Sequence, residues 1–190
     1  MNNTSPSFIG RFMLPDVSFC DKLIKHFEKS KKKQYPGMLY NTEMKEKQIH
    51  GDKRSTDMHI IGKLREEYEI NLQVCLEKYW KEFPDSDKTN SYSINEHINM
   101  QRYNPPDEGF VGWHTERGGI YNARRHLVFM TYLNTVKKGG ETEYFYHKIK
   151  VKPKKGLTLI WPVDWTHLHR GLPSPKETKY IITGWFSYNL

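Results

Sequence analysis

Cysteine is scarce in this sequence, and long apolar runs are missing from it. The 190 residues include 2 cysteines, Cys20 and Cys75, which do not form a paired spacing motif. A disulfide framework is therefore not expected, and we interpret both side chains as buried thiols. No apolar run approaches the roughly 20 residues that cross a bilayer, and residues 1–6 lack the basic start and apolar core of a secretory leader. These features predict a soluble, cytoplasmic protein without a membrane partner.

Positive charge is abundant but dispersed. The 30 Lys and Arg residues outnumber the 22 Asp and Glu residues, which gives a formal net charge of +8. Such a charge is compatible with binding to nucleic acid or to an acidic partner. The lysines, however, form short clusters at 31–33, 137–138 and 152–155, and clusters of this kind usually mark solvated loops. Charge alone therefore identifies no substrate.

The first 90 residues have a mainly helical pattern. Apolar residues recur at helical spacing between Pro15 and Ser30 and again from about Ser55 to Phe83, where Pro84 ends the pattern. Residues 31–57 are polar and aperiodic, which predicts a long loop with a short strand near 37–41. We expect this loop to border the functional site.

The second half of the chain has the pattern of short strands. Five runs rich in β-branched and aromatic residues are bounded by Gly, Pro and Asn, at 94–103, 127–134, 143–152, 156–161 and 179–188. Helices followed by many strands predict an α+β chain, mainly β, in which the helices support a sheet or sandwich. We expect one domain over residues 1–190, helical to about residue 90 and β-rich from about residue 91.

Two histidines and a glutamate form a candidate iron site. Residues i and i+2 of an extended segment project to the same face, so His114 and Glu116 can reach one metal ion. His169 would add a third ligand from a distant strand. Two imidazoles and one carboxylate with open coordination positions are the facial triad of non-haem Fe(II) oxygenases. His167 competes with His169, because it lies two residues away and could share its face.

An iron site of this type suggests a 2-oxo acid as cosubstrate. The open positions would accept a bidentate 2-oxo acid beside O2, and its oxidative decarboxylation would allow attack on an unactivated C–H bond. The far carboxylate of 2-oxoglutarate needs a buried cation, which Lys179 can supply, and Thr183 shares the strand face of Lys179. Tyr103 and Tyr132 would add phenol donors from two other strands.

Several short motifs of the second half occur in a characteristic order. They are His114-x-Glu116, Tyr132-Leu133-Asn134, Gly139-Gly140-Glu141-Thr142, the turn from Pro153 to Gly156, His169-x-Gly171-x-Pro173 and Lys179. Over roughly residues 94–188 this order resembles the prolyl 4-hydroxylase-like 2-oxoglutarate- and Fe(II)-dependent dioxygenases. The resemblance implies a double-stranded β-helix, or jelly roll, with the N-terminal helices packed on its major sheet.

The same resemblance implies roles for individual residues. His114, Glu116 and His169 would ligate Fe(II), while His167 would lie at the rim. The cosubstrate would be held by Lys179, Tyr103, Tyr132 and Thr183, and Trp185 would lie near the metal. One departure is that the family usually has Asp where this chain has Glu116. The extra methylene moves the carboxylate by about one C–C bond, which a different rotamer can absorb.

The substrate expected from the resemblance is a prolyl residue of a protein or peptide. Hydroxylation would use O2 and convert 2-oxoglutarate to succinate and CO2, with ascorbate as a further candidate cofactor, and residues 31–57 and 104–112 are candidate lids. Smaller relatives act on small molecules. The positive charge keeps oxidative dealkylation of nucleic acid as an alternative, although such jelly-roll enzymes use arginines after the distal histidine to hold 2-oxoglutarate. A non-catalytic metal-binding jelly-roll module is a third reading, which the open triad disfavours.

Overall fold

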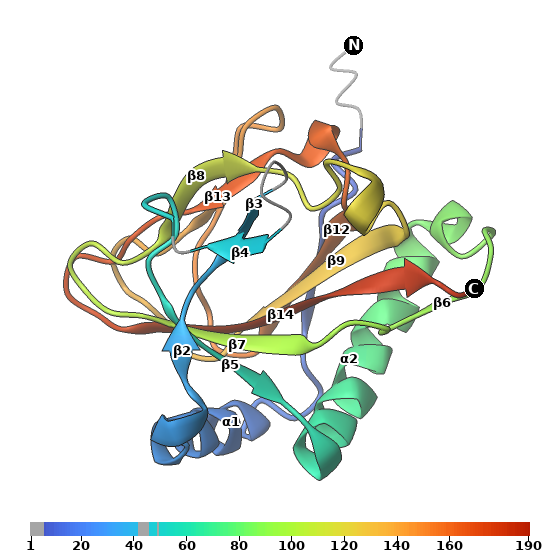
Figure 1. Ribbon diagram of the computed structural model, residues 1–190. Helices are drawn as coiled ribbons and strands as arrows, with labels where there is room; N and C mark the ends of the chain where they lie inside the picture. The colour runs from blue at the N-terminus through green and yellow to red at the C-terminus, as the bar shows by residue number, and fades with distance from the viewer. Residues whose placement is uncertain (1–5, 42–45, 49) are drawn as a thin grey trace.

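The computed structural model describes residues 6–41, 46–48 and 50–190, so part of the predicted 31–57 loop lies outside the described residues. Two antiparallel sheets form a sandwich, and two α-helices, α1 (Phe19–Lys29) and α2 (Gly62–Glu82), lie on the far side of the larger sheet in the described part of the chain (Figure 1). None of the helices in this part is long and apolar enough to cross a membrane.

Within the described residues the larger sheet has eight strands and the smaller sheet has four. The larger has the order β1 (Gly10–Met13), β12 (Leu157–Pro162), β9 (Arg125–Tyr132), β14 (Lys179–Tyr188), β7 (Ile98–Tyr103), β5 (Thr56–Ile60) and β2 (Tyr35–Pro36), with β6 (Tyr92–Ser93) beside β14. The smaller has the order β11 (Ile149–Val151), β10 (Thr142–Tyr144), β13 (His169–Gly171) and β8 (Phe110–His114). A separate hairpin pairs β3 (Leu39–Asn41) with β4 (Glu46–Gln48).

The alternation of side chains along the larger sheet separates two apolar cores. On the helix side, Met100, Phe129 and Ile182 pack with residues of α1 and α2, including the fully buried Phe27 and Tyr68. On the other side, strands β9 and β12 pack against the smaller sheet through a second cluster of buried residues, which includes Met130, Tyr132, Leu159, Trp161, Tyr144 and Val151. Successive strand residues face opposite layers, so Asn99 and Gln101, which flank Met100 on β7, face the smaller sheet.

A buried ion pair anchors one end of this sandwich. Lys53 Nζ donates to Asp57 Oδ2 at 2.7 Å, and both side chains are almost fully buried. Asp57 also accepts hydrogen bonds from Ser55 Oγ and from Asn99 Nδ2. The turn before Lys53 reaches the smaller sheet, where the Val111 amide donates to the Asp52 carbonyl. Asp57 therefore connects β5, β7 and the approach to β8.

Three sequence-based predictions of elements need correction. Residues 56–60 form strand β5, whereas the predicted helix began near Ser55; pairing with β7 over five residues determines the outcome. The run at 143–152 is a hairpin, with β10 and β11 joined by a turn, rather than one strand. Part of the predicted 104–112 lid is strand β8, because Phe110 to His114 pair with β13. The predicted helix within 15–30 is confirmed, and both cysteines are buried and free as predicted.

Candidate metal centre

The three predicted metal ligands come together at one end of the smaller sheet. His114 ends β8, His169 begins β13, and the two residues are direct partners across the strands. Glu116 follows β8 by two residues, and its amide donates to the Val163 carbonyl. One potential ligand atom from each of the three side chains lies within 4.8 Å of the other two.

Both imidazoles have their orientation fixed by the backbone. Nδ1 of His114 donates to the Gly112 carbonyl and Nδ1 of His169 donates to the His167 carbonyl, each at 2.9 Å. Nε2 of each ring then carries a free lone pair. This atom lies 3.7 Å from Glu116 Oε1 in His114 and 3.5 Å from it in His169. Backbone acceptors of this kind select the tautomer that binds a metal. The donor set and its orientation fit a divalent iron ion.

The protonation states suit a metal as well. Burial, together with the neighbouring His169, lowers the pKa of His114 to about 3, so this imidazole is neutral near pH 7. Burial would raise the pKa of Glu116, but the contact with His169, the neighbouring His114 and Arg125 lower it to about 2, so the carboxylate is ionised. A neutral imidazole and an ionised carboxylate are the forms that coordinate metals.

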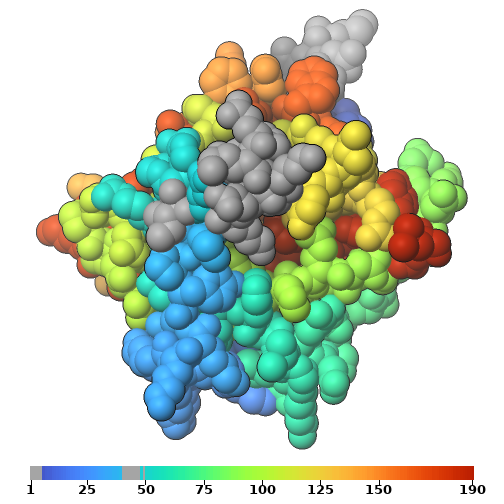
Figure 2. Space-filling view, viewed as in Figure 1, coloured from blue at the N-terminus to red at the C-terminus, as the bar shows by residue number. Residues whose placement is uncertain are grey.

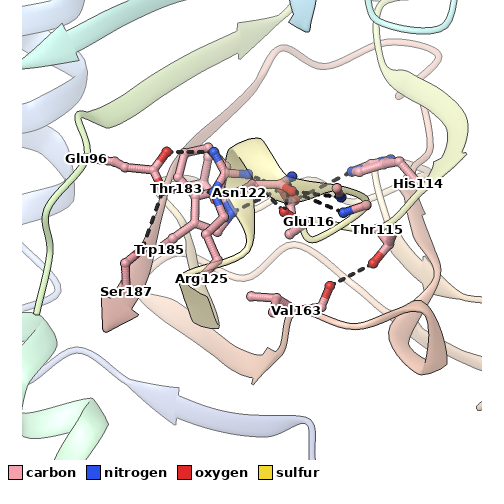
Figure 3. A network of polar contacts seen from close by, with 12 residues as sticks. Glu96, His114, Thr115, Glu116, Asn122, Arg125, Val163, Thr183, Trp185 and Ser187 are labelled. Atoms are coloured by element: carbon pink, nitrogen blue, oxygen red, sulfur yellow. Dashed lines mark hydrogen bonds and ion pairs between the residues drawn. The ribbon is translucent and has the colours of Figure 1, made fainter. Parts of the chain in front are cut away.

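The second oxygen of Glu116 has its own partners (Figure 3). Trp185 Nε1 donates to Glu116 Oε2 at 3.0 Å, and Arg125 Nη1 lies 3.6 Å from the same oxygen. Arg125 also stacks on the Trp185 ring at 3.5 Å and forms a two-point ion pair with Glu96. Trp185 was expected near the metal site and lies there. Glu116 thus offers Oε1 to the histidines, while Oε2 is held by Trp185 and Arg125, which form one wall of the site.

Aromatic rings surround the two histidines. Phe110 stacks on the His114 ring at 3.6 Å with an interplanar angle of 6°. Tyr144 and Trp161 lie 5.8 and 5.1 Å from the His169 ring, and in the described chain their hydroxyl and indole N–H have no hydrogen-bond partner. The rings keep water from His169 and, in part, from His114, which strengthens electrostatic interactions in the site.

Lys179 and Tyr103, two of the predicted cosubstrate residues, lie against each other. They are direct partners across β14 and β7, and Lys179 Nζ lies 4.8 Å above the Tyr103 ring. The ammonium is buried and donates to the carbonyls of Gly140 and Leu172 at 3.1 Å. Burial lowers the pKa of Lys179 to about 8, although Glu141 raises it in part. A buried ammonium next to a hydrophobic wall is well suited to bind a carboxylate.

Thr183 and Tyr132 share the inner face of the sheet but have other partners. On β14, Thr183 lies two residues beyond Ile181, which pairs with Tyr132. The Thr183 hydroxyl donates to the Phe129 carbonyl. The Tyr132 hydroxyl lies 2.6 Å from Thr142 Oγ1 and 3.0 Å from the Val151 carbonyl. Of the four predicted cosubstrate residues, only Tyr103 is brought directly to Lys179 within the described structure.

The histidine and arginine beside His169 face away from the three ligand atoms. His167 contacts the Ser7 carbonyl through Nε2 and stacks near His147. Arg170 Nε donates to Glu143 on the outer side of the smaller sheet. Sequence reasoning missed Arg125, Glu96 and Phe110; the doublet Arg124-Arg125, nine residues beyond a buried carboxylate, is the signal that could have identified Arg125.

A hollow opens beside Arg125 and Glu96. It has a volume of about 270 Å³, and the residues lining it include Glu96, Asn122, Arg125 and Ser187. Asn122 Nδ2 and Arg125 Nη1 both donate to the Glu116 carbonyl, so the hollow borders the segment that carries Glu116. It is large enough for a side chain of a partner molecule.

The comparisons with known sequences agree with this geometry. Residues 98–187 match the sequence model of the 2OG-Fe(II) oxygenase superfamily. Prolyl 4-hydroxylase 13 of Arabidopsis thaliana is 28% identical over an alignment of 125 positions, and the match covers 54% of this chain and 44% of that protein. Probable prolyl 4-hydroxylase 9 of the same plant is 27% identical over 118 residues, covering 49% of this chain and 41% of that protein. The chain spans less than half the length of these relatives.

Solved structures of similar fold are also prolyl hydroxylases. A viral collagen prolyl hydroxylase from Paramecium Bursaria Chlorella virus-1, in complex with 2OG, has a TM-score of 0.66 at 20% identity and covers 96% of this chain and 97% of its own. A Trichoplax adhaerens prolyl hydroxylase bound to a hypoxia-inducible-factor peptide has a TM-score of 0.70 at 16% identity, covering 95% and 84%. The predicted jelly-roll fold with supporting helices is confirmed.

Proposed function

We propose that this protein hydroxylates a prolyl residue of a protein or peptide, because residues 98–187 match the 2OG-Fe(II) oxygenase superfamily and the similar proteins are prolyl hydroxylases. The observation that carries the proposal is the convergence of His114 Nε2, His169 Nε2 and Glu116 Oε1 on one point. These three side chains would hold Fe(II) and leave coordination positions open for other ligands.

The chemistry is that of the bound iron and cosubstrate. With Fe(II) and 2-oxoglutarate in place, O2 is reduced while 2-oxoglutarate is oxidised to succinate and CO2 and one oxygen atom enters a C–H bond of the substrate. The residues of the chain orient the proposed metal ligands and keep water out of the site. Arg125 and Trp185 hold Glu116 Oε2, so that the carboxylate keeps one orientation, and Phe110 fixes the plane of the His114 ring.

Lys179 is the proposed anchor for the far carboxylate of 2-oxoglutarate. Its ammonium is already oriented by two backbone carbonyls, and a carboxylate would replace part of the solvation that burial removes. The Tyr103 ring supports the ammonium from below, and Thr183 lies on the same strand face. We retain Tyr132 as a proposed cosubstrate residue, and its hydroxyl is held by Thr142.

The prolyl substrate is supported by the similar proteins. The names of the Arabidopsis relatives and of the viral and Trichoplax structures all specify prolyl hydroxylases, and the Trichoplax enzyme is bound to a peptide. The hollow lined by Glu96, Asn122 and Arg125 borders Glu116 and is where we place the approach of the substrate. No observation specifically favours nucleic acid, because Arg170, the arginine after His169, bonds Glu143 outside the site.

The remaining sequence-based expectations stay predictions. We infer one domain over residues 1–190, because α1 and α2 share an apolar core with the larger sheet. A cytoplasmic location and a role for ascorbate also stay predictions.

Replacing each proposed ligand tests the assignment. His114→Ala, Glu116→Ala and His169→Ala should each abolish Fe(II)-dependent formation of succinate with a prolyl peptide. His126→Ala is the matched control, because this imidazole contacts the Ser86 carbonyl and Tyr188 instead. Anaerobic titration with Fe(II) and 2-oxoglutarate should give a visible charge-transfer band in the wild type and in the control. Full turnover in any ligand variant would contradict the proposal.

A further inference from the structure

Four aromatic rings form a row on the outer side of the smaller sheet. Neighbouring ring centroids are 5.1 Å apart from Trp113 to Phe145, 5.1 Å from Phe145 to Tyr146 and 5.9 Å from Tyr146 to Trp165. Phe145, Tyr146 and Trp165 are 50%, 56% and 66% exposed. We call these four residues the aromatic ladder. Contiguous exposed aromatic surface of this kind usually marks a site of interaction.

The ladder lies outside the metal centre, although one end comes close to it in the chain. Trp113 faces outward because its neighbour His114 faces inward on β8. Phe145 and Tyr146 belong to the β10–β11 turn, and Trp165 to the short 3₁₀ helix η4 (Trp165–His167); Figure 2 shows these two segments, in two shades of orange, side by side at the top. Two residues before Trp165, the Val163 carbonyl accepts the amides of Glu116 and Arg117. The ladder thus begins next to the segment that carries Glu116.

The geometry of the ladder presents ring edges beside ring faces, and it leaves two donors open. The three neighbouring ring pairs are nearly perpendicular, at 81°, 86° and 88°. Each edge-to-face pair offers a ring face beside a ring edge, against which a flat aliphatic ring can pack. In the described part of the chain no residue accepts a hydrogen bond from the Tyr146 hydroxyl or the Trp165 indole N–H. Both donors are free to bind backbone carbonyls of a partner.

The rim of the ladder is positively charged. Arg170 lies 4.3 Å from the Trp113 ring, and the β10–β11 turn and the residues after it add Lys148, Lys150 and Lys152. The acidic residues near the ladder are already paired: Glu143 binds Arg170 and Lys150, and Asp164, which precedes Trp165, binds Arg117. The surplus of positive charge is complementary to an acidic partner.

We propose that the aromatic ladder docks a proline-rich segment of polypeptide that carries acidic residues, outside the site that accepts the target residue. A polyproline II segment has no internal hydrogen bonds, so its carbonyls are free, and two of its residues advance about 6 Å, close to the ring spacing. Such segments bind in grooves lined by aromatic rings. The choice of a proline-rich occupant rests on the proposed prolyl hydroxylation.

Single-stranded nucleic acid fits the ladder less well. Bases bind aromatic side chains by stacking on ring faces, one base after another. In the ladder each ring turns its edge toward the face of the next, so consecutive parallel faces are not offered. The perpendicular arrangement therefore favours polypeptide over nucleic acid.

Binding of a labelled peptide tests the proposal. Fluorescein-(Pro-Pro-Glu)₅ is titrated with the protein loaded anaerobically with Fe(II) and 2-oxoglutarate, and anisotropy is measured. We expect binding by the wild type, at least tenfold weaker binding by the double variant Phe145→Ser/Tyr146→Ser and by Trp165→Ser, and no change in Ile70→Ser, a matched exposed residue on α2. The peptide (Pro-Pro-Lys)₅ should bind at least tenfold more weakly than its acidic counterpart.

Three outcomes would overturn the proposal: no binding by the wild type, equal binding by the ladder variants, or equal competition by unlabelled oligothymidine. Succinate formation with a short single-proline peptide tests the proposed function separately, and the ladder variants should retain it. Peptide binding without turnover by the wild type would refute prolyl hydroxylation and leave the ladder in place. Turnover without peptide binding would refute the ladder alone.

Discussion

Glu116 presents its two carboxylate oxygens to different partners. Oε1 lies between the two imidazoles, whereas Oε2 accepts from Trp185 and lies near Arg125. Arg125 is fixed in turn by Glu96. The glutamate side chain is therefore long enough to place Oε1 between the histidines and Oε2 against Trp185 at the same time.

Glu116→Asp should weaken metal binding, even though aspartate is the usual residue of the family that the sequence resembles. A shorter side chain cannot keep both the ligand point and the Trp185 hydrogen bond, and loss of such a supporting contact typically costs about 10–100-fold in metal affinity. Anaerobic titration with Co(II), followed by visible absorption, measures the affinity. Glu143→Asp, which shortens a carboxylate outside the site, is the control. Wild-type affinity in Glu116→Asp would show that the wall adapts to either residue.

Lys179 should make the affinity for 2-oxoglutarate depend on pH. Burial lowers the pKa of Lys179 to about 8 in the free protein, so the ammonium is charged below pH 8 and loses its proton as the pH rises through 8. Only the charged form binds a carboxylate strongly, so the dissociation constant should be constant near pH 7 and rise about tenfold per pH unit well above 8. Fluorescence titration between pH 6.5 and 9.5 measures it. Lys179→Arg, which stays charged, should flatten the profile; a flat profile in the wild type would refute the anchor role.

At the scale of elements, strand β5 depends on a buried charge. Asp57 neutralises Lys53 and accepts hydrogen bonds from Ser55 and Asn99, so it connects β5 with β7 and with the turn that approaches β8. The two side chains are 6% and 2% exposed, so neither charge can be solvated by water if the other is removed.

Asp57→Ala should reduce the free energy of unfolding by about 3–5 kcal/mol, because it leaves the Lys53 ammonium buried without a partner. Urea unfolding followed by circular dichroism measures the change. The double variant Lys53→Met/Asp57→Leu should regain much of the loss, since it buries no charge. Asp85→Ala, which removes an exposed ion pair with Lys88, should leave stability unchanged. A small loss in Asp57→Ala would mean that water reaches Lys53.

The same strand shows where sequence patterns mislead. Met58, Ile60 and Ile61 continue into the helical spacing of Leu64 and Tyr68, so the period of the helix extends backwards over β5. Pairing with β7, which lies some forty residues later, decides the conformation, and local sequence does not contain that information. By contrast, the apolar spacing of α1 reflects a face that is buried, and its position was predictable.

At the scale of the whole molecule, the candidate metal centre joins the two sheets. His114 and His169 come from the smaller sheet, while Trp185 and Lys179 come from β14 of the larger one. Ligands that bind between the layers of the folded protein, and not to the unfolded chain, stabilise the fold by mass action.

Metal and 2-oxoglutarate should therefore raise the melting temperature. At a ligand concentration of 100 times Kd the gain is about 2.7 kcal/mol, which for a chain of this size corresponds to a shift of roughly 5–10 °C. Differential scanning fluorimetry with Mn(II) and 2-oxoglutarate measures the shift, and a chelator should reverse it. His169→Ala should show no such shift; an equal shift in this variant would place the metal elsewhere.

Local motifs made part of this centre predictable. His114 and Glu116 lie two residues apart, and the residues around His169 form a short motif, so sequence alone identified all three side chains that the fold brings together. Arg125, Glu96 and Lys53 were missed, because each becomes meaningful only through a partner from another strand or loop. The hydrogen-bond partners of the Thr183 and Tyr132 hydroxyls could not be predicted either, because they come from other strands.

The direct pairing of His114 with His169 also constrains strand alignment. In an antiparallel pair a shift of one residue turns every side chain of the shifted strand to the opposite face. Such a shift of β8 would bring Trp113 into the interior and expose the imidazole. A metal bound by both histidines therefore selects one register of β8 and β13, and the amide hydrogens of these strands should exchange with deuterium more slowly when metal is present.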